Sequence, residues 1–153
     1  NYFRHNDKMS FDLSKAKHLN DYHIQVEDKL YFGDVKWIKN ADLESFTIPY
    51  PELIGNLALD KNHVFFKGEI IPEADSKTFK ILEECLDGTY YLESDNTFYA
   101  KDNKYAYFIR TINTEVKVIK TKSLNDFHFK VIDERGYAFD KEYSYYMGKR
   151  TKI

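Results

Sequence analysis

The chain has 153 residues, of which 42 % are hydrophobic, 31 % are charged and 17 % are aromatic. This length fits one domain with a real core, and this composition excludes an intrinsically disordered protein. With 23 basic and 25 acidic residues the net charge is −2, so nothing in the charge predicts nucleic acid or an anionic membrane as a partner.

Three further bulk features limit the function classes. No apolar run approaches the roughly 18 residues of a membrane-spanning helix. Cys85 is the only cysteine, which excludes an intrachain disulfide and favours a small buried hydrophobe over a thiol site. The sequence begins at Asn1 rather than Met, so a signal peptide or lipid anchor could have preceded it.

The 13 tyrosines and 12 phenylalanines predict a β-rich protein with an aromatic core. Near the start, residues 14–19 are compatible with a short helix and residues 23–26 with a strand. From residue 28 onward the chain repeats itself, which is its main organisational feature. The first copy, roughly residues 28–49, contains YFGDVKWIKNADLESF, which aligns with VFFKGEIIPEADSKTF at residues 64–79.

The second copy, roughly residues 57–86, shows the parts of one repeat most clearly. Its Asp60-Lys61-Asn62 segment predicts a turn, because an Asx side chain bonds the backbone and tolerates a left-handed conformation. Residues 64–67 follow as the return strand, Gly68 provides the next turn, and residues 69–71 form a third strand.

A short helix is expected after each set of strands. In the second copy Asp75 predicts an N-cap for a helix over residues 76–85, with apolar residues on one face. In the third copy Ser123 with Asp126 resembles a capping box.

Two more copies complete the chain, at roughly residues 99–132 and 137–153. YAKDNKYAYF places a turn at Asp102, and YAFDKEYSYYMG places turns at Asp140 and Gly148. Residues 115–120 alternate valine with charged residues and predict a strand with one wet face. The turn aspartates lie 42 and 38 residues apart, a spacing too irregular for a regular solenoid.

These patterns predict a β-rich α+β fold. It consists of repeated antiparallel β-meander or hairpin units, each followed by a short helix, packed as one compact domain over residues 1–153. The segments Asp60-Lys61-Asn62 and Lys67-Gly68 and their repeats are expected to be structural turns rather than ligand sites.

The turns and the aromatic pairs that follow them resemble the DKNYY family of bacterial repeat proteins. The signature stands as Asp60-Lys61-Asn62 with Phe65-Phe66, as Asp102-Asn103-Lys104 with Tyr107-Phe108, and as Asp140-Lys141-Glu142 with Tyr145-Tyr146. The downstream Ala-Asp-x-x-x-Phe element of the family matches residues 74–79 and 41–46. This resemblance implies a non-enzymatic protein, often exported, in some settings part of an effector–immunity pair.

Adjacent residues of a strand point to opposite faces, so each aromatic pair has one member on a second face of its sheet. Either another layer covers that face, or it is exposed and binds a partner. The candidate binding aromatics are Phe66, Tyr107 and Tyr145. Acidic loop residues, Asp87, Glu93, Asp95 and Asp102, are the candidates for binding a toxin.

The sequence contains no P-loop, G-x-S-x-G or G-x-G-x-x-G motif and no calcium-loop or H-x-x-x-H pattern. We therefore expect no cofactor, no metal and no catalytic residue. The leading hypothesis is a protein-binding module of the bacterial envelope or an exported protein. An immunity protein, cytoplasmic if its toxin is, is the alternative, and a hydrolase with an unrecognised site is a third. Oligomeric state is left open.

Overall fold

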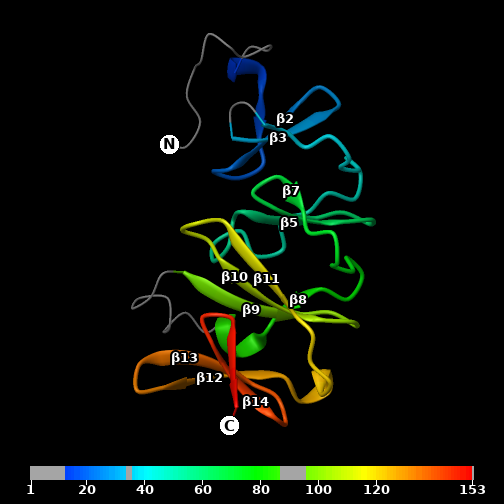
Figure 1. Ribbon diagram of the computed structural model, residues 1–153. Helices are drawn as coiled ribbons and strands as arrows, with labels where there is room; N and C mark the ends of the chain where they lie inside the picture. The colour runs from blue at the N-terminus through cyan, green and yellow to red at the C-terminus, as the bar shows by residue number, and fades with distance from the viewer. Residues whose placement is uncertain (1–12, 34–35, 87–95, 153) are drawn as a thin grey trace. The chain divides into compact units, whose positions relative to one another are not determined.

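The computed structural model describes residues 13–33, 36–86 and 96–152 (Figure 1). The chain divides into two compact units, residues 1–72 and residues 73–153. Each unit contains two antiparallel sheets, which we number one to four in chain order. The boundary between the units therefore falls between the second and third sheets.

The first unit holds sheets one and two. Sheet one has the order β1-β2-β3-β4 and sheet two the order β5-β6-β7. The strands are β1 (Lys17–His18), β2 (His23–Val26), β3 (Lys29–Phe32), β4 (Lys36–Trp37), β5 (Leu57–Leu59), β6 (Val64–Phe66) and β7 (Glu69–Ile70), with a 3-10 helix at Leu13–Lys15.

The second unit holds sheets three and four. Sheet three has the order β11-β10-β9-β8 and sheet four the order β12-β13-β14-β15. The strands are β8 (Lys80–Ile81), β9 (Thr97–Lys101), β10 (Ala106–Arg110), β11 (Glu115–Ile119), β12 (His128–Ile132), β13 (Arg135–Phe139), β14 (Tyr143–Tyr146) and β15 (Lys149–Lys152), with 3-10 helices at Glu83–Leu86 and Leu124–Asp126.

The α+β prediction with a helix after each repeat is wrong. Over the described residues the structure is 43 % strand in four antiparallel sheets and only 7 % helix, and no helix there reaches seven residues. The predicted strands at residues 23–26 and 115–120 are present as β2 and β11.

The segment after Asp75 shows why the helix does not form. Phe79 N–H donates to the Asp75 carbonyl at 3.0 Å, which completes a single turn. The chain then straightens, because Lys80 and Ile81 pair with Lys101 and Ala100 of β9. Asp75 thus begins a single turn, in which its carboxylate accepts the hydroxyl of Thr78, and pairing with a distant strand overrides the helical spacing that follows.

The other two helical predictions fail in the same way. Residues predicted as a helix at 14–19 form a short 3-10 turn and then β1. Ser123 makes no side-chain cap, and only a 3-10 turn follows it. Both segments are short, and tertiary pairing decides such segments more strongly than local propensity.

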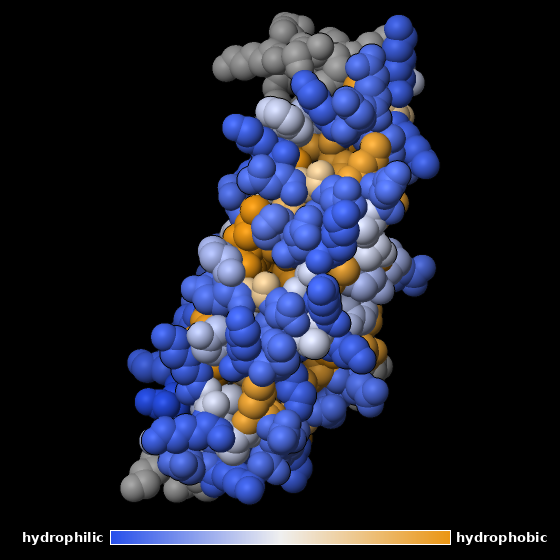
Figure 2. Space-filling model, turned by 90° about the vertical axis from the view of Figure 1, so that its right-hand side faces the viewer, coloured by the Kyte–Doolittle hydropathy of each residue, from blue (hydrophilic) through white to orange (hydrophobic). Residues whose placement is uncertain are grey.

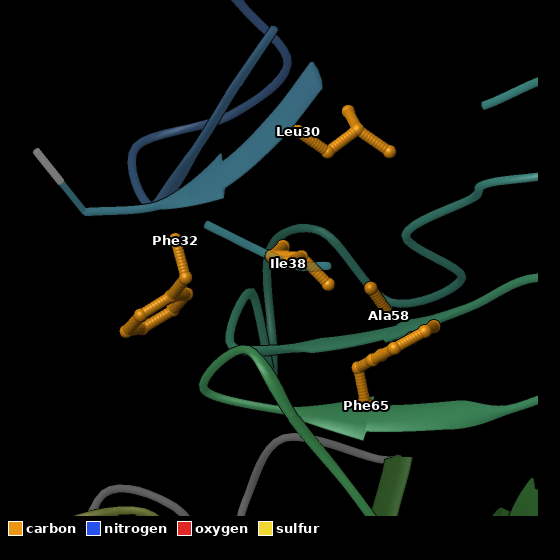
Figure 3. Packing of buried hydrophobic residues seen from close by; sticks show 5 residues of the cluster. All are labelled: Leu30, Phe32, Ile38, Ala58 and Phe65. Atoms are coloured by element: carbon orange, nitrogen blue, oxygen red, sulfur yellow. The ribbon is translucent and has the colours of Figure 1, made fainter. Parts of the chain in front are cut away.

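The core of the first unit lies between the strands of its two sheets (Figure 3). Leu30, Phe32 and Ile38 come from sheet one and the segment after it, and Ala58 and Phe65 come from sheet two. Partly buried hydrophobic residues of the connecting loop, among them Phe46, pack against this cluster. Side chains alternate between the two faces of a strand, which explains why Leu30 and Phe32 of β3 both enter the core.

The core of the second unit is aromatic. Tyr99 of β9 contacts the rings of Phe108, Phe127 and Phe129 at centroid distances of 5.2, 6.1 and 5.8 Å. Phe127 also packs on Tyr145, at 5.4 Å. Sheets three and four are thus joined by tilted aromatic contacts, which stabilise beyond their buried area.

Glycine turns lie against aromatic rings of the preceding sheet in both units. Gly68 has φ +80°, and a Cβ atom there would lie 2.8 Å from Cβ of Phe32. Gly148 has φ +77°, and its Cβ would lie 2.7 Å from Cδ2 of Phe108. A glycine is required at these positions both for the left-handed backbone and for the close approach.

The described residues form no helix that is long and apolar enough to cross a membrane. Hydrophilic residues cover most of the face shown in Figure 2, and hydrophobic residues show through in the gaps between them.

His23 is fully buried in the first unit. Its ring contacts Phe32 and Phe46 edge-on, and its Nδ1 lies 2.9 Å from Oδ1 of Asn20. Its Nε2 is buried with no hydrogen-bond partner among the described residues. Burial lowers the pKa of His23 to about 4, because a charged ring would be desolvated in this position.

We expect Gly148→Ala to lower the free energy of unfolding by about 1–3 kcal/mol, from backbone strain and from the clash with Phe108. Thermal unfolding followed by circular dichroism measures this change. Met147→Ala is the matched control, because Met147 already has φ +51° with an L side chain in the same turn. A Gly148→Ala protein as stable as the Met147→Ala protein would contradict the role of the close approach.

The first unit should lose stability as pH falls from about 6.5 to about 4. The pKa of His23 is lower in the folded state than in the unfolded state, so the unfolded state binds the proton first as pH falls. Proton binding therefore favours the unfolded state in this window, and the folded state loses stability. The full effect is on the order of 3 kcal/mol. Denaturation followed by Trp37 fluorescence reports this unit alone, since Trp37 is the only tryptophan. In His23→Phe the free energy of unfolding should depend less on pH between about 6.5 and 4. An unchanged pH dependence would show that other groups cause it.

Candidate functional site

Each repeated aspartate closes its own turn with one carboxylate oxygen. Oδ1 of Asp60 accepts the amides of the residues two and three positions ahead, at 2.8 and 2.7 Å. Asp102 and Asp140 make the same pair of bonds at 2.7 or 2.8 Å. In all three turns the aspartate amide donates to the carbonyl three residues ahead at 3.0 Å. The three turns are therefore the same structure.

The other carboxylate oxygen binds the segment that precedes the strand. Oδ2 of Asp60 accepts the amide of Asp42 at 2.7 Å, and Oδ2 of Asp102 accepts the amide of Asp75 at 2.9 Å. Oδ2 of Asp140 accepts the hydroxyl of Thr121 at 2.5 Å. One carboxylate thus joins a local turn to a segment 18 to 27 residues earlier in the chain.

A serine or threonine hydroxyl completes each turn, and the sequence analysis did not predict these residues. The amide after each aspartate donates to Oγ of Ser45, Oγ1 of Thr78 or Oγ of Ser123, at 2.9 to 3.0 Å. Ser45 and Thr78 lie three residues after Asp42 and Asp75, and each hydroxyl donates to that aspartate at 2.5 Å. The repeated spacing Asp-x-x-Ser/Thr could have revealed them.

Tyrosine hydroxyls bind two of these carboxylates. Tyr107 donates to Oδ2 of Asp102 at 2.6 Å, and Tyr145 donates to Oδ2 of Asp140 at 2.7 Å. Burial alone would raise the pKa of Asp102, but the bonds from Tyr107 and three amides outweigh it and hold that pKa below its usual value. Burial, reinforced by the neighbouring carboxylate, raises the pKa of both tyrosines.

The turn groups are therefore occupied by the protein itself. Lys61 and Asn62 are exposed residues of the turn and contribute backbone amides to it. Within the described ranges no cluster of three or more His, Cys, Asp or Glu residues could hold a metal ion. This geometry is that of a structural turn, as expected from the sequence.

The predicted binding aromatics are core residues. The side chains of Phe66, Tyr107 and Tyr145 are 2, 0 and 1 % exposed, so they do not form an exposed patch. The acidic residues Asp87, Glu93 and Asp95 lie outside the described residues. Cys85 is buried, as the sequence suggested.

An open hollow of about 440 Å³ lies beside β8 and β9, with Glu83, Glu84, Lys101 and His128 in its lining. Two of its polar side chains are hydrogen-bonded to the backbone of the protein itself. Oε1 of Glu84 accepts the amide of Phe129 at 3.0 Å, and Nζ of Lys101 donates to the carbonyl of Leu124 at 3.3 Å.

Tyr146 is the exception among the aromatic pairs. It is 42 % exposed, whereas Phe66 and Phe108, at the same position of earlier repeats, are 2 and 1 % exposed. Tyr146 lies on the outer face of sheet four, opposite to the buried side chains of Phe129, Ala138 and Tyr145. We call this surface the C-terminal face. Strand alternation and register place on it His128, Lys130, Ile132, Arg135, Tyr137, Phe139, Ser144, Tyr146, Lys149 and Thr151.

Aromatic rings form a connected row across the C-terminal face. His128 stacks on Phe139 at 5.5 Å, Phe139 contacts Tyr137 at 6.3 Å, and Tyr137 contacts Tyr146 at 5.3 Å. Ile132, on the same face, is 40 % exposed.

The charges of this face have a single sign. Lys130, Arg135 and Lys149 are exposed, and the face carries no acidic side chain. The sequence signal for this face is the alternation in residues 128–132 and 135–139, which sequence reasoning did not use.

The fold and the turns define a repeat protein made of small antiparallel sheets, three of which each contain a turn closed by a buried aspartate. The model of the DKNYY family matches residues 23–153. The chain therefore belongs to the DKNYY family, as its turns and aromatic pairs suggested. Neither the comparison with curated proteins nor that with solved structures gives a match.

We expect Asp102→Ala to lower the free energy of unfolding by about 2–4 kcal/mol, because three backbone amides and the Tyr107 hydroxyl lose this acceptor. Asp102→Asn should cost less, since its oxygen can still close the turn. Asp126→Ala is the control: its exposed pair with Lys141, at 3.5 Å, should contribute about 0–1 kcal/mol. Denaturant titration at pH 7 measures all three; equal values for Ala and Asn at residue 102 would contradict the turn role.

Proposed function

We propose that the protein is a non-enzymatic protein-binding module and that the C-terminal face is its binding surface. The observation that carries this proposal is the exposure of Tyr146 at a repeat position that is buried in the earlier sheets. A tyrosine in a row of rings offers a large and rigid contact area with a polar edge, which is the usual chemistry of a binding hot spot.

The charge of the face favours an acidic partner. Lys130, Arg135 and Lys149 surround the aromatic row, and cations of one sign attract and orient an acidic surface during encounter. The paired strands also supply a preformed platform, which lowers the cost of ordering on binding. An envelope or exported setting fits this role and belongs to the proposal.

The immunity-protein alternative gains no support from the acidic residues on which it rested. The carboxylate of Asp102 is engaged in its turn and with Tyr107. The other three acidic residues lie outside the described part of the chain. A toxin would remain compatible with the proposal only as an acidic partner of the C-terminal face.

Affinity capture from a lysate of the source organism tests the proposal. Three baits are compared by quantitative mass spectrometry: the wild type, a Tyr146→Ser/Lys149→Glu variant, and an Ile112→Ser control. Ile112 is 61 % exposed but lies in the β10–β11 turn, away from the C-terminal face. We expect a protein that the wild type and the control retain and that the face variant loses at least about tenfold.

Circular dichroism must first show that all three baits fold with equal stability. The proposal fails if the face variant captures the same proteins as the wild type. It also fails if Ile112→Ser is the variant that loses the partner.

A further inference from the structure

A pair formed by an aromatic residue and a lysine recurs on neighbouring strands. Phe32 pairs with Lys36, Phe108 with Lys117, and Tyr146 with Lys149. In each pair the two side chains stand on the same face of their sheet, because they are directly opposite in the strand register. The Nζ of Lys117 lies 5.9 Å from the centre of the Phe108 ring.

Within this chain the first two pairs each receive a glycine turn. The backbone at Gly68 lies against Phe32, and the backbone at Gly148 lies against Phe108. These rings are 7 and 1 % exposed. Both turns are two-residue hairpin connections, Lys67-Gly68 and Met147-Gly148, in which both residues have positive φ.

In the two pairs that contact a glycine turn, the lysine also binds that turn. Lys36 forms an ion pair with Glu69, the residue directly after Gly68. The Nζ of Lys117 donates to the carbonyl of Met147, directly before Gly148, at 3.3 Å. The aromatic ring therefore supplies the contact surface, and the lysine fixes the turn through its carbonyl or its acidic neighbour.

A tyrosine at the neighbouring strand position adds further bonds. Tyr99 is opposite Phe108, and its hydroxyl accepts the amide of Gly148 at 3.1 Å and reaches the carbonyl of Tyr145 at 3.4 Å. In sheet four Tyr137 occupies the same register opposite Tyr146. The ring centroids of the two pairs are 5.2 and 5.3 Å apart.

The set Tyr137, Tyr146 and Lys149 thus reproduces Tyr99, Phe108 and Lys117, which hold a glycine turn in this chain. Tyr146 remains 42 % exposed. We propose that this set is a receptor for a glycine-containing β-hairpin turn of a partner protein, with an acidic residue directly after the glycine. This inference rests on the proposed function and specifies the partner that the C-terminal face recognises.

Charge selects the partner turn. Lys130, Arg135 and Lys149 would oppose their own copies if two C-terminal faces met, which is unfavourable for a symmetric dimer. The turn at Gly148 is followed by Lys149 and lacks the acidic residue, whereas the turn at Gly68 is followed by Glu69. A Gly-Glu turn is complementary to Lys149 in the way that Glu69 is complementary to Lys36.

The test uses a hairpin peptide that copies residues 64–71 and is closed by a disulfide between added terminal cysteines. The peptide is titrated into the full, ¹⁵N-labelled chain, and amide chemical shifts locate and quantify binding. We expect saturable shifts at Tyr137, Tyr146 and Lys149. Peptides carrying Gly68→Ala or Glu69→Lys should bind at least about tenfold more weakly, as should the wild-type peptide to a Tyr146→Ser chain.

The Ile112→Ser chain is the matched control and should bind the peptide as the wild type does. Undiminished binding to the Tyr146→Ser chain, or equal binding of the Gly68→Ala peptide, would overturn the inference. A wild-type dimer that disappears in Tyr146→Ser would instead identify a second copy as the occupant. Tighter binding of a single-stranded oligouridine to the same amides would identify nucleic acid. Either result would contradict the proposal of a hairpin receptor.

The two proposals fail separately. If the face variant loses a captured protein but the hairpin peptide causes no shifts, the protein-binding function stands and the hairpin receptor is wrong. If the peptide binds at Tyr146 but no captured protein depends on the face, the receptor chemistry stands and the protein-binding function fails.

Discussion

A buried carboxylate that must be fully hydrogen-bonded is the constraint on which this fold depends. Asp60, Asp102 and Asp140 are only 3, 6 and 7 % exposed, and an ionised group at such a position is costly unless it is saturated with donors. One oxygen is satisfied by the turn itself and the other by an earlier segment. In these three turns one carboxylate therefore holds both the hairpin and its contact with an earlier segment.

The geometry of the aromatic pairs follows from this turn. Because the turn fixes where the return strand starts, it also fixes which aromatic residue of the pair points to which face. The first, such as Tyr107 or Tyr145, points to the face where its hydroxyl reaches the turn carboxylate. The second, such as Phe108, points the other way and is covered by a glycine turn of the following sheet. A carboxylate and a glycine, each required by local geometry, thus determine how neighbouring sheets of one unit pack.

Sequence reasoning succeeded where the physics is local and failed where it is not. An Asx turn and a left-handed glycine depend on a few adjacent atoms, so Asp60, Gly68 and their repeats could be placed from the sequence. The helix after Asp75 could not be excluded, because Lys80 and Ile81 pair with residues of β9 that lie about 20 positions further along the chain. Burial was equally inaccessible: alternation assigns Phe66 and Tyr146 to a second face, but only the packed structure shows which face is covered. The C-terminal face was missed for that reason, and the acidic residues proposed in its place included one, Asp102, that the scaffold uses.

The identity of the residue at the exposed position agrees with a binding role. The three buried members of this position, Phe32, Phe66 and Phe108, are phenylalanines, whereas the exposed one, Tyr146, is a tyrosine. A phenylalanine suits permanent burial, but a tyrosine can be wet in the free protein and buried in a complex, because its hydroxyl is satisfied in both states. The cations around it also favour reversible binding, since they keep the free face hydrated and repel the same face of a second copy. A surface built in this way favours reversible contact with a different, acidic protein over a permanent contact with itself.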